Sequence, residues 1–232
     1  MNASTPATPN SDLTGRARIR DAALAVFADR GTKGTTVQLV AEQAGVSTGL
    51  IRHHFGSKAG LLTACDDYAI GTMLDQARSA LDEETAADPG VVEQMYATDR
   101  AGSRYLARAL AEGTSAAVQL YAAGADLAER FLSERWPDRF PPGSIQVRDA
   151  AGVMGTMHLS PLIMHAHLSQ RMGVDALDQE GAPRVAAAIA TVYQTMADFF
   201  DAEEGQRIAD ALPGSTDDDG PKGHQTAGRG PS

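Results

Sequence analysis

Residues 35–62 read TTVQLVAEQAGVSTGLIRHHFGSKAGLL, and this stretch decides the fold. Its first half predicts a short helix, because apolar side chains recur there at the spacing of one helix face, at Val37, Val40, Ala41 and Ala44. Thr35 and Thr36 stand just before them, and threonine is a favourable helix cap. Gly45 then supplies the backbone freedom that a helix end needs, and Val46 is placed to anchor the turn in the core.

A second short helix is predicted directly after this turn, with Ser47 as its cap. Residues three or four positions apart share a helix face. One face therefore holds Leu50, Ile51 and Phe55, and the other holds Thr48, Gly49, Arg52 and His53. Glycine in a helix interior costs about 1 kcal/mol relative to alanine. Gly49 is either a tolerated irregularity or a position where a missing side chain lets the backbone approach a phosphate or a base edge.

Two short helices joined by a glycine-containing turn are typical of a helix-turn-helix, whose second helix enters the major groove of DNA. A third helix is predicted from Lys58. A cation is normally disfavoured at a helix N-terminus, but a bound anion reverses that preference, so Lys58 indicates a phosphate contact. An earlier helix is predicted to end near Gly31, from the spacing of Ile19, Ala22, Ala23, Val26 and Phe27. The pattern favours a DNA-binding regulator.

The run from Ile19 to Leu62 resembles the DNA-binding domain of the TetR family of bacterial repressors. The matching residues are Ala22, Ala23, Phe27, Gly31, Thr36, Ala41, Ala44, Gly45, Val46, Ser47, Gly49, Phe55, Lys58, Leu61 and Leu62. Their ordered spacing covers about the first third of the chain. The resemblance implies an all-α protein, in which the helix-turn-helix domain is followed by a helical ligand-binding and dimerisation domain.

One position departs from the pattern of that family. Three residues after the glycine of the recognition helix the family usually carries a tyrosine that contacts the DNA backbone, whereas this chain has Arg52. Arg52 can either make a charge-assisted phosphate contact or read a guanine edge. His54 fits the family's pattern, and His53 either touches DNA or is a solvated surface residue. The expected DNA-binding residues are Thr36, Ser47, Thr48, Gly49, Arg52, His53, His54 and Lys58.

The charge of the chain is segregated along its length. The 232 residues carry a formal net charge of −10, which taken alone disfavours nucleic acid. Residues 1–62 hold seven basic and four acidic side chains, a balance of +3, whereas the remainder holds 13 basic and 26 acidic ones, a balance of −13. A basic N-terminal part followed by an acidic remainder is suited to DNA binding, because affinity depends on local neutralisation of phosphates. Arg16, Arg18 and Arg20 form either a basic arm toward DNA or a solvated first turn.

Composition predicts four segments: an unstructured tail over 1–13, the DNA-binding domain over 14–62, the helical domain over 63–210 and an unstructured tail over 211–232. The single cysteine, Cys65, is expected to be a buried structural thiol rather than a redox sensor. With no apolar run of membrane length and no signal peptide, we expect no membrane partner and a cytoplasmic location. No catalytic arrangement or metal-ligand spacing is found, so neither enzymatic activity nor a cofactor or metal is expected.

Helical periodicity continues through the body of the chain. Helices are expected at 58–83, 90–121, 124–136, 144–171 and 183–204, with a kink or split at Pro161. A ligand pocket is expected among residues 90–170, because methionine and amphipathic aromatic side chains suit small apolar ligands. The candidate lining residues are Tyr96, Tyr105, Tyr121, Phe131, Met154, Met157, His158 and Met164. The same spacing also describes ordinary core.

The last predicted helix carries a broad apolar stripe, made of Val185, Ile189, Val192, Tyr193, Met196 and Phe200. The family resemblance implies that this helix packs against its twin in a homodimer, and an internal core helix is the alternative. A dimer presents two recognition helices about 34 Å apart to two half-sites. The sequence therefore predicts a cytoplasmic repressor of a near-palindromic double-stranded DNA operator, released by a small-molecule effector. A ligand-independent regulator or an activator is the alternative, and an enzyme or a protein-interaction module is less expected.

Overall fold

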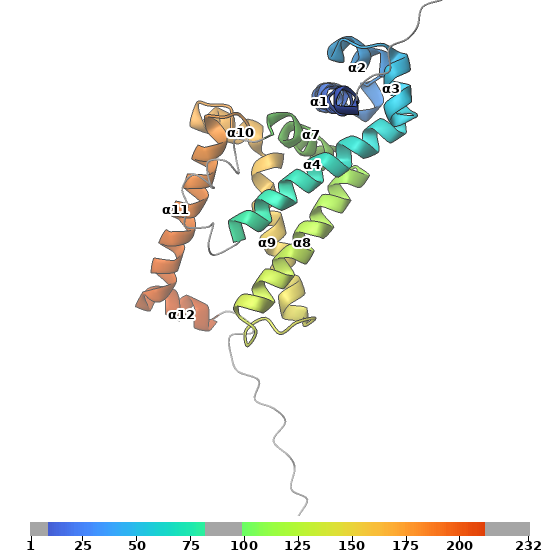
Figure 1. Ribbon diagram of the computed structural model, residues 1–232. Helices are drawn as coiled ribbons and strands as arrows, with labels where there is room; N and C mark the ends of the chain where they lie inside the picture. The colour runs from blue at the N-terminus through green and yellow to red at the C-terminus, as the bar shows by residue number, and fades with distance from the viewer. Residues whose placement is uncertain (1–8, 82–98, 212–232) are drawn as a thin grey trace, which may run out of the picture. The chain divides into compact units, whose positions relative to one another are not determined.

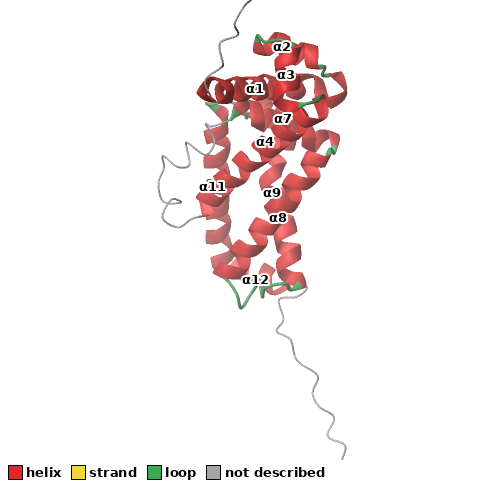
Figure 2. Ribbon diagram, turned by 45° about the vertical axis from the view of Figure 1, so that its right-hand side comes forward, coloured by secondary structure: helices red, strands yellow, loops and turns green. Residues whose placement is uncertain are grey.

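The computed structural model describes residues 9–81 and 99–211, and every regular element within them is a helix. Figure 1 labels the helices in chain order, and Figure 2 shows them joined by loops. The all-α fold class predicted from the sequence is confirmed. By its internal contacts the chain forms two compact units, Met1–Ala186 and Ala187–Ser232. Among the described helices, none is both long and apolar enough to cross a membrane.

The first helix, α1 (Pro9–Gly34), begins earlier than expected. Residues 9–13 of the predicted tail are helical, because proline at the first helical position loses no backbone hydrogen bond; residues 1–8 lie outside the described residues. The predicted break at Gly31 is confirmed, with φ 68° and ψ 176° there. The buried hydroxyl of Thr35 donates to the Gly31 carbonyl oxygen at 2.8 Å, which fixes the exit of the chain from this break.

The two short helices of the central stretch lie where the sequence predicts them, as α2 (Val37–Ala44) and α3 (Thr48–Phe55). The hydroxyl of Thr36 accepts a hydrogen bond from the backbone N–H of Leu39 at 3.2 Å. Gly45 adopts the left-handed conformation at φ 65° and ψ 38°. Ser47 caps α3 by accepting from the N–H of Leu50 at 3.2 Å. These three signals are confirmed because each of them acts within a few residues.

The long helix α4 (Lys58–Leu81) shares its core with α1 and with α7 (Arg100–Glu112). Tyr105 of α7 packs edge-on against Phe27 of α1, with ring centroids 6.2 Å apart, and its hydroxyl donates to the Asp66 carboxylate of α4. Burial, reinforced by the neighbouring Asp66 carboxylate, raises the pKa of the Cys65 thiol to about 12. The thiol is therefore buried and protonated at neutral pH, as expected of a structural cysteine.

The predicted break between residues 121 and 124 is wrong. The chain turns instead at Gly113, which is left-handed at φ 63°, and α8 (Ser115–Arg135) passes straight through Gly124. A glycine does not end a helix whose buried stripe continues on both sides of it. Here that stripe runs from Leu120 to Ala128 and Leu132.

The predicted split near Pro161 is confirmed, since α9 (Ile145–Ile163) and α10 (His165–Met172) are separated at Met164. Pro161 has no N–H to donate to the carbonyl four residues earlier. The Ser160 hydroxyl donates to that Met157 carbonyl at 2.8 Å instead, which satisfies the acceptor. Along its other face, α9 packs against α8 through Val147 and Ala151.

The last two helices are α11 (Gly181–Asp201) and α12 (Glu203–Ala211). Sequence periodicity predicts α11 but not α12, because α12 is short and mostly polar. The turn between them is tight, and a Cβ at Gly205 would lie 2.1 Å from the Phe199 carbonyl oxygen. Within the C-terminal tail predicted over 211–232, Ala211 is still helical, and the residues after it lie outside the described residues.

Candidate nucleic-acid interface

The recognition helix α3 is anchored by one face and leaves the other open. Ile51 and Phe55 are 1% and 9% exposed and belong to the same core as α1, α2 and α4. Arg52 and His53 are exposed, Gly49 is exposed and Thr48 is half-buried. Figure 1 shows α3 beside α2 in the N-terminal part of the chain. Of the residues predicted to contact DNA, the outward face of α3 therefore carries Gly49, Arg52 and His53.

Gly49 is not required by the packing of the chain. A Cβ placed on it would meet the Ser47 hydroxyl oxygen at 3.6 Å, which is ordinary van der Waals contact. Alanine would fit there and would favour the helix. Packing within the protein therefore does not explain why this residue is glycine. This supports the alternative in which the backbone at Gly49 lies against a phosphate or a base edge.

Gly60, by contrast, is required where α3 meets α4. A Cβ at Gly60 would lie 2.2 Å from the carbonyl oxygen of Phe55, a backbone atom at the end of α3. The N–H of Gly60 also donates to the Ser57 hydroxyl at 3.1 Å, which caps α4. No sequence pattern marks this glycine as required, because the requirement comes from a close backbone approach that residue spacing does not reveal.

Lys58 lies at the start of α4, as predicted, and makes a contact that the sequence does not indicate. Its ammonium donates to the backbone carbonyl oxygen of Thr32 at 2.6 Å, which links α4 to the end of α1. An ammonium carries three N–H donors. The contact therefore positions the charge beside the helix-turn-helix and leaves donors for a phosphate.

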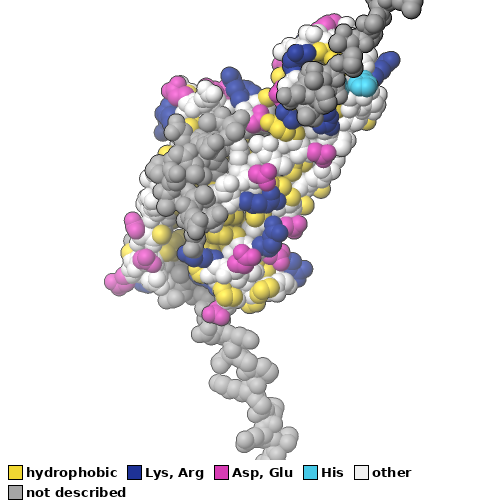
Figure 3. All heavy atoms as spheres, viewed as in Figure 1, with side chains coloured by type: hydrophobic (Ala, Val, Ile, Leu, Met, Phe, Trp, Pro, Cys, Tyr) yellow, Lys and Arg dark blue, Asp and Glu magenta, His cyan; other side chains and the backbone are white. Residues whose placement is uncertain are grey.

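The three arginines of the predicted basic arm differ in their surroundings. Arg16 lies over the ring of Phe55, with its guanidinium carbon 5.1 Å from the ring centroid, and Arg18 is exposed. Arg20 pairs with Asp21 at 2.7 Å and stacks on the ring of Tyr68 at 3.4 Å. In Figure 3, blue side chains lie around the N-terminal helices. Arg16 and Arg18 are therefore the members of this group best placed to meet an external anion.

The residues proposed from sequence to line a ligand pocket are not gathered in one place. Tyr105 lies in the core, and Phe131 and Met154 pack against the separate cluster between α8 and α9. Tyr121 and Met157 line an open hollow of about 470 Å³ between α8 and α9, where the Tyr121 hydroxyl donates to the Gly152 carbonyl at 3.1 Å. The remaining described candidates, His158 and Met164, are exposed, and Tyr96 lies outside the described residues.

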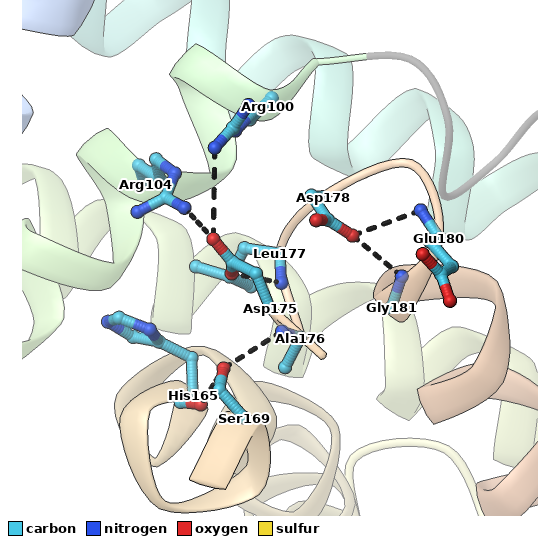
Figure 4. Close-up of polar contacts among 10 residues, drawn as sticks. All are labelled: Arg100, Arg104, His165, Ser169, Asp175, Ala176, Leu177, Asp178, Glu180 and Gly181. Carbon is cyan, nitrogen blue, oxygen red and sulfur yellow. Dashed lines mark hydrogen bonds and ion pairs between the residues drawn. The ribbon is translucent and has the colours of Figure 1, made fainter. Parts of the chain in front are cut away.

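A second hollow, also of about 470 Å³, has charged side chains along it, and no sequence pattern indicates it. Arg104 of α7, His165 of α10 and Asp175 of the following loop lie along it. Figure 4 shows the side chains of Arg100 and Arg104 directed at the Asp175 carboxylate. Arginines four residues apart on one helix face were the signal available in the sequence, but their partner is 71 residues away from Arg104.

The stripe predicted for a dimer interface divides along α11. Val185 is buried at 7% exposure and Ile189 is half-buried. The second half of the helix exposes the large apolar side chains Val192, Tyr193, Met196, Phe199 and Phe200, each 37–54% exposed. An exposed apolar face of this extent is typical of a surface that binds another protein surface.

Comparisons with known proteins agree with this arrangement. The family model of bacterial regulatory proteins of the tetR family matches residues 19–65. The HTH-type transcriptional regulatory protein RaaS of Mycobacterium tuberculosis is 38% identical over 128 residues, which cover 54% of this chain and 58% of RaaS. The HTH-type transcriptional repressor Rv3405c of the same organism is 40% identical over 113 residues, covering 47% of this chain and 55% of that protein. The chain thus spans just over half the length of these curated relatives.

A solved structure shares the fold. The complex of SmeT with triclosan superposes with a TM-score of 0.50 and 19% sequence identity, covering 78% of this chain and 91% of SmeT. SmeT is described as the repressor of the Stenotrophomonas maltophilia multidrug efflux pump SmeDEF. Residues 19–65 therefore form a DNA-binding domain of the tetR family of bacterial regulatory proteins. The chain is similar to HTH-type transcriptional regulators over about half of its length, and it shares the all-helical fold of SmeT.

Proposed function

We propose that the chain is a homodimeric transcriptional repressor that binds a near-palindromic DNA operator and is released by a small molecule. The observation that carries the proposal is the open face of α3, where Arg52 and His53 are exposed while Ile51 and Phe55 hold the helix in the core. A helix held in this way can enter the major groove without loss of packing. The proposed DNA-contacting residues remain Thr36, Ser47, Thr48, Gly49, Arg52, His53, His54 and Lys58.

The exposed apolar face of α11 supports the dimer. Such a face loses its contact with water when two copies associate, and each 100 Å² of apolar surface buried contributes about 2.5 kcal/mol. Two copies also give two recognition helices, which a near-palindromic operator requires.

The connection of α7 to the DNA-binding helices supports release by a ligand. Tyr105 links α7 to Asp66 of α4, and Arg108 donates to the Asp29 carbonyl oxygen of α1 at 3.4 Å. A ligand that favours another position of α7 would therefore bias the position of α1 and α4. A tenfold loss of DNA affinity needs only about 1.4 kcal/mol of such coupling.

Binding to the DNA upstream of the chain's own gene, across a series of salt concentrations, tests the proposal. Affinity should fall linearly with salt on logarithmic axes, because phosphate contacts release counterions. A specific duplex should be preferred over a scrambled one by about a thousandfold or more at a given salt concentration. Equal affinity for both duplexes at every salt concentration would contradict the proposal.

Gly49→Ala is expected to separate folding from DNA binding. Alanine fits at this exposed helical position, so the free energy of unfolding should rise by up to about 1 kcal/mol. The added methyl group should hold the backbone away from DNA and lower the affinity about tenfold or more, or about 1.4 kcal/mol. Urea denaturation and gel-shift titration measure the two effects.

Gly124→Ala in α8 is the matched control, since a Cβ there meets no atom within 4 Å. It should stabilise the protein without changing DNA affinity. Unchanged DNA affinity in Gly49→Ala would show that Gly49 is only a tolerated irregularity.

Lys58→Gln is expected to weaken binding to all duplexes alike. Glutamine keeps an N–H donor for the Thr32 carbonyl oxygen but removes the charge, and Lys58→Ala removes both. The slope of log affinity against log salt should decrease by about 2 in both variants, about 1 for each subunit of the dimer. Titration of two operator sequences that differ in one base pair provides the check, because altered base preference would rule out a phosphate contact.

A further inference from the structure

Four charged or ionisable side chains meet beside the loop that joins α10 to α11. Arg104 of α7 donates to the Asp175 carboxylate, and Arg100, one turn earlier, places a guanidinium nitrogen 3.8 Å from the same oxygen. The other Asp175 oxygen accepts from the backbone N–H of Leu177 at 3.0 Å. His165, at the start of α10, lies near the same carboxylate (Figure 4) and lowers its pKa by its charge. Two arginines thus contact a single carboxylate, with a histidine nearby.

This cluster opens into the second hollow of about 470 Å³. The side chains of Arg104 and Asp175 are 34% and 31% exposed, so the ion pair is accessible to solutes. Ala166 and Val174 line the same hollow and give it an apolar part. Arg100 and Arg104 together outnumber the single negative charge of Asp175, so the cluster carries an excess positive charge next to an apolar surface.

We propose that Arg100, Arg104 and His165 bind the carboxylate of a small organic acid, and that Asp175 is the internal occupant which the acid displaces. The apolar part of the acid would lie against Ala166 and Val174. Binding of the acid does not depend on the proposed function. Only the further conclusion, that the acid is the effector that releases DNA, rests on the proposed function. The binding itself can be tested without DNA.

The chemistry of the cluster favours a carboxylate over other anions. A guanidinium group forms two parallel hydrogen bonds with a planar carboxylate, and the resident group is already a carboxylate. Partial burial by itself raises the pKa of Asp175, but the Leu177 N–H and the charges of Arg104, Arg100 and His165 lower it below its usual range. The cluster thus already stabilises an ionised carboxylate.

The same helix face connects the cluster to the DNA-binding helices. Arg100, Arg104 and Arg108 follow one another at four-residue spacing on α7. The guanidinium of Arg108 donates to Glu112 at 2.5 Å and to the Asp29 carbonyl oxygen of α1 at 3.4 Å. An acid bound to the first two arginines would free the loop that leads into α11 and act on the helix that contacts α1.

Isothermal titration of the full-length chain with benzoate tests the site, with benzamide as the neutral analogue of the same shape. Benzoate should bind and benzamide should not. Asp175→Asn keeps an acceptor for Leu177 but removes the competing charge. If the aspartate holds the site nine-tenths of the time, this variant should bind benzoate about tenfold more tightly. Arg104→Gln should abolish binding.

Asp178→Asn is the matched control in the same loop. The Asp178 carboxylate accepts from the backbone N–H groups of Glu180 and Gly181, at 3.0 and 2.7 Å, so its loss should leave benzoate affinity unchanged. Far-ultraviolet circular dichroism of each variant verifies that it is folded. Equal binding of benzoate and benzamide, no benzoate binding to Asp175→Asn, or unchanged affinity in Arg104→Gln would each overturn the site.

Two further measurements distinguish a failure of the carboxylate site from a failure of the proposed function. Inorganic phosphate that competes with benzoate at equal concentration would identify a general anion site and overturn the assignment to a carboxylate. Gel-shift titration then reports on the effector role. If benzoate binds but leaves DNA affinity unchanged, the acid is not the effector. If the chain binds benzoate but no specific DNA, the proposed function is wrong, whereas the carboxylate site is still supported.

Discussion

Replacing Gly60 by alanine is expected to lower the free energy of unfolding by about 3 kcal/mol, the upper range for an overpacked site. The added Cβ would lie 2.2 Å from the Phe55 carbonyl oxygen, and a backbone atom at the end of α3 cannot move aside as a flexible side chain does. Relief of this contact should shift α3 against α4, so specific DNA binding should also weaken. Urea denaturation measures the first effect and gel-shift titration the second.

Gly71→Ala provides the control in the same helix. A Cβ at Gly71 meets no atom within 4 Å, so alanine there should raise the free energy of unfolding by up to about 1 kcal/mol. The two substitutions make the same chemical change in α4 and are expected to have opposite signs. A Gly60→Ala protein as stable as the unmodified chain would show that α3 and α4 do not approach as closely as described.

Replacing Met196 by glutamate is expected to convert the proposed dimer to a monomer. Met196 is 45% exposed in the middle of the apolar face of α11, and a charge there would be buried without a partner on association. A monomer has one recognition helix. It therefore lacks the gain that a dimer obtains when its second recognition helix binds the neighbouring half-site at high effective concentration. Operator affinity should fall by about 100-fold or more. Sedimentation equilibrium and gel-shift titration measure the two results.

Gln194→Glu adds the same charge about half a turn around the helix from Met196. Gln194 is exposed but lies off the apolar face, so this variant should remain dimeric with unchanged operator affinity. If Met196→Glu also remained dimeric, another surface would have to form the interface.

The helix-turn-helix was predictable because its signals are local. Thr36 and Ser47 each cap a backbone N–H three residues later, and Gly45 ends α2 by its own left-handed conformation. The inward positions of Ile51 and Phe55 follow from helical spacing alone. Arg52 is placed on the outward face, as predicted, and whether it contacts a phosphate or a base edge stays a prediction.

The body was less predictable because its determinants join distant residues. Tyr105 has the spacing of a pocket residue, yet it lies in the core because Asp66, 39 residues away, accepts its hydroxyl. The Arg104–Asp175 pair spans 71 residues. The break predicted between residues 121 and 124 lies within α8, since tertiary packing outweighs the helix-breaking preference of Gly124. Pairings of this kind leave no periodic trace in the sequence.

Selection of bound sequences from a pool of random DNA duplexes tests the central claim most directly. A dimer that presents two copies of α3 should enrich an inverted repeat, with half-site centres about 34 Å apart or a multiple of that spacing. Arg52→Ala should change or relax the preference at one position of each half-site if Arg52 reads a base, and should leave the preference intact if it binds phosphate. Enrichment of no sequence, or of a single site without two-fold symmetry, would contradict the account.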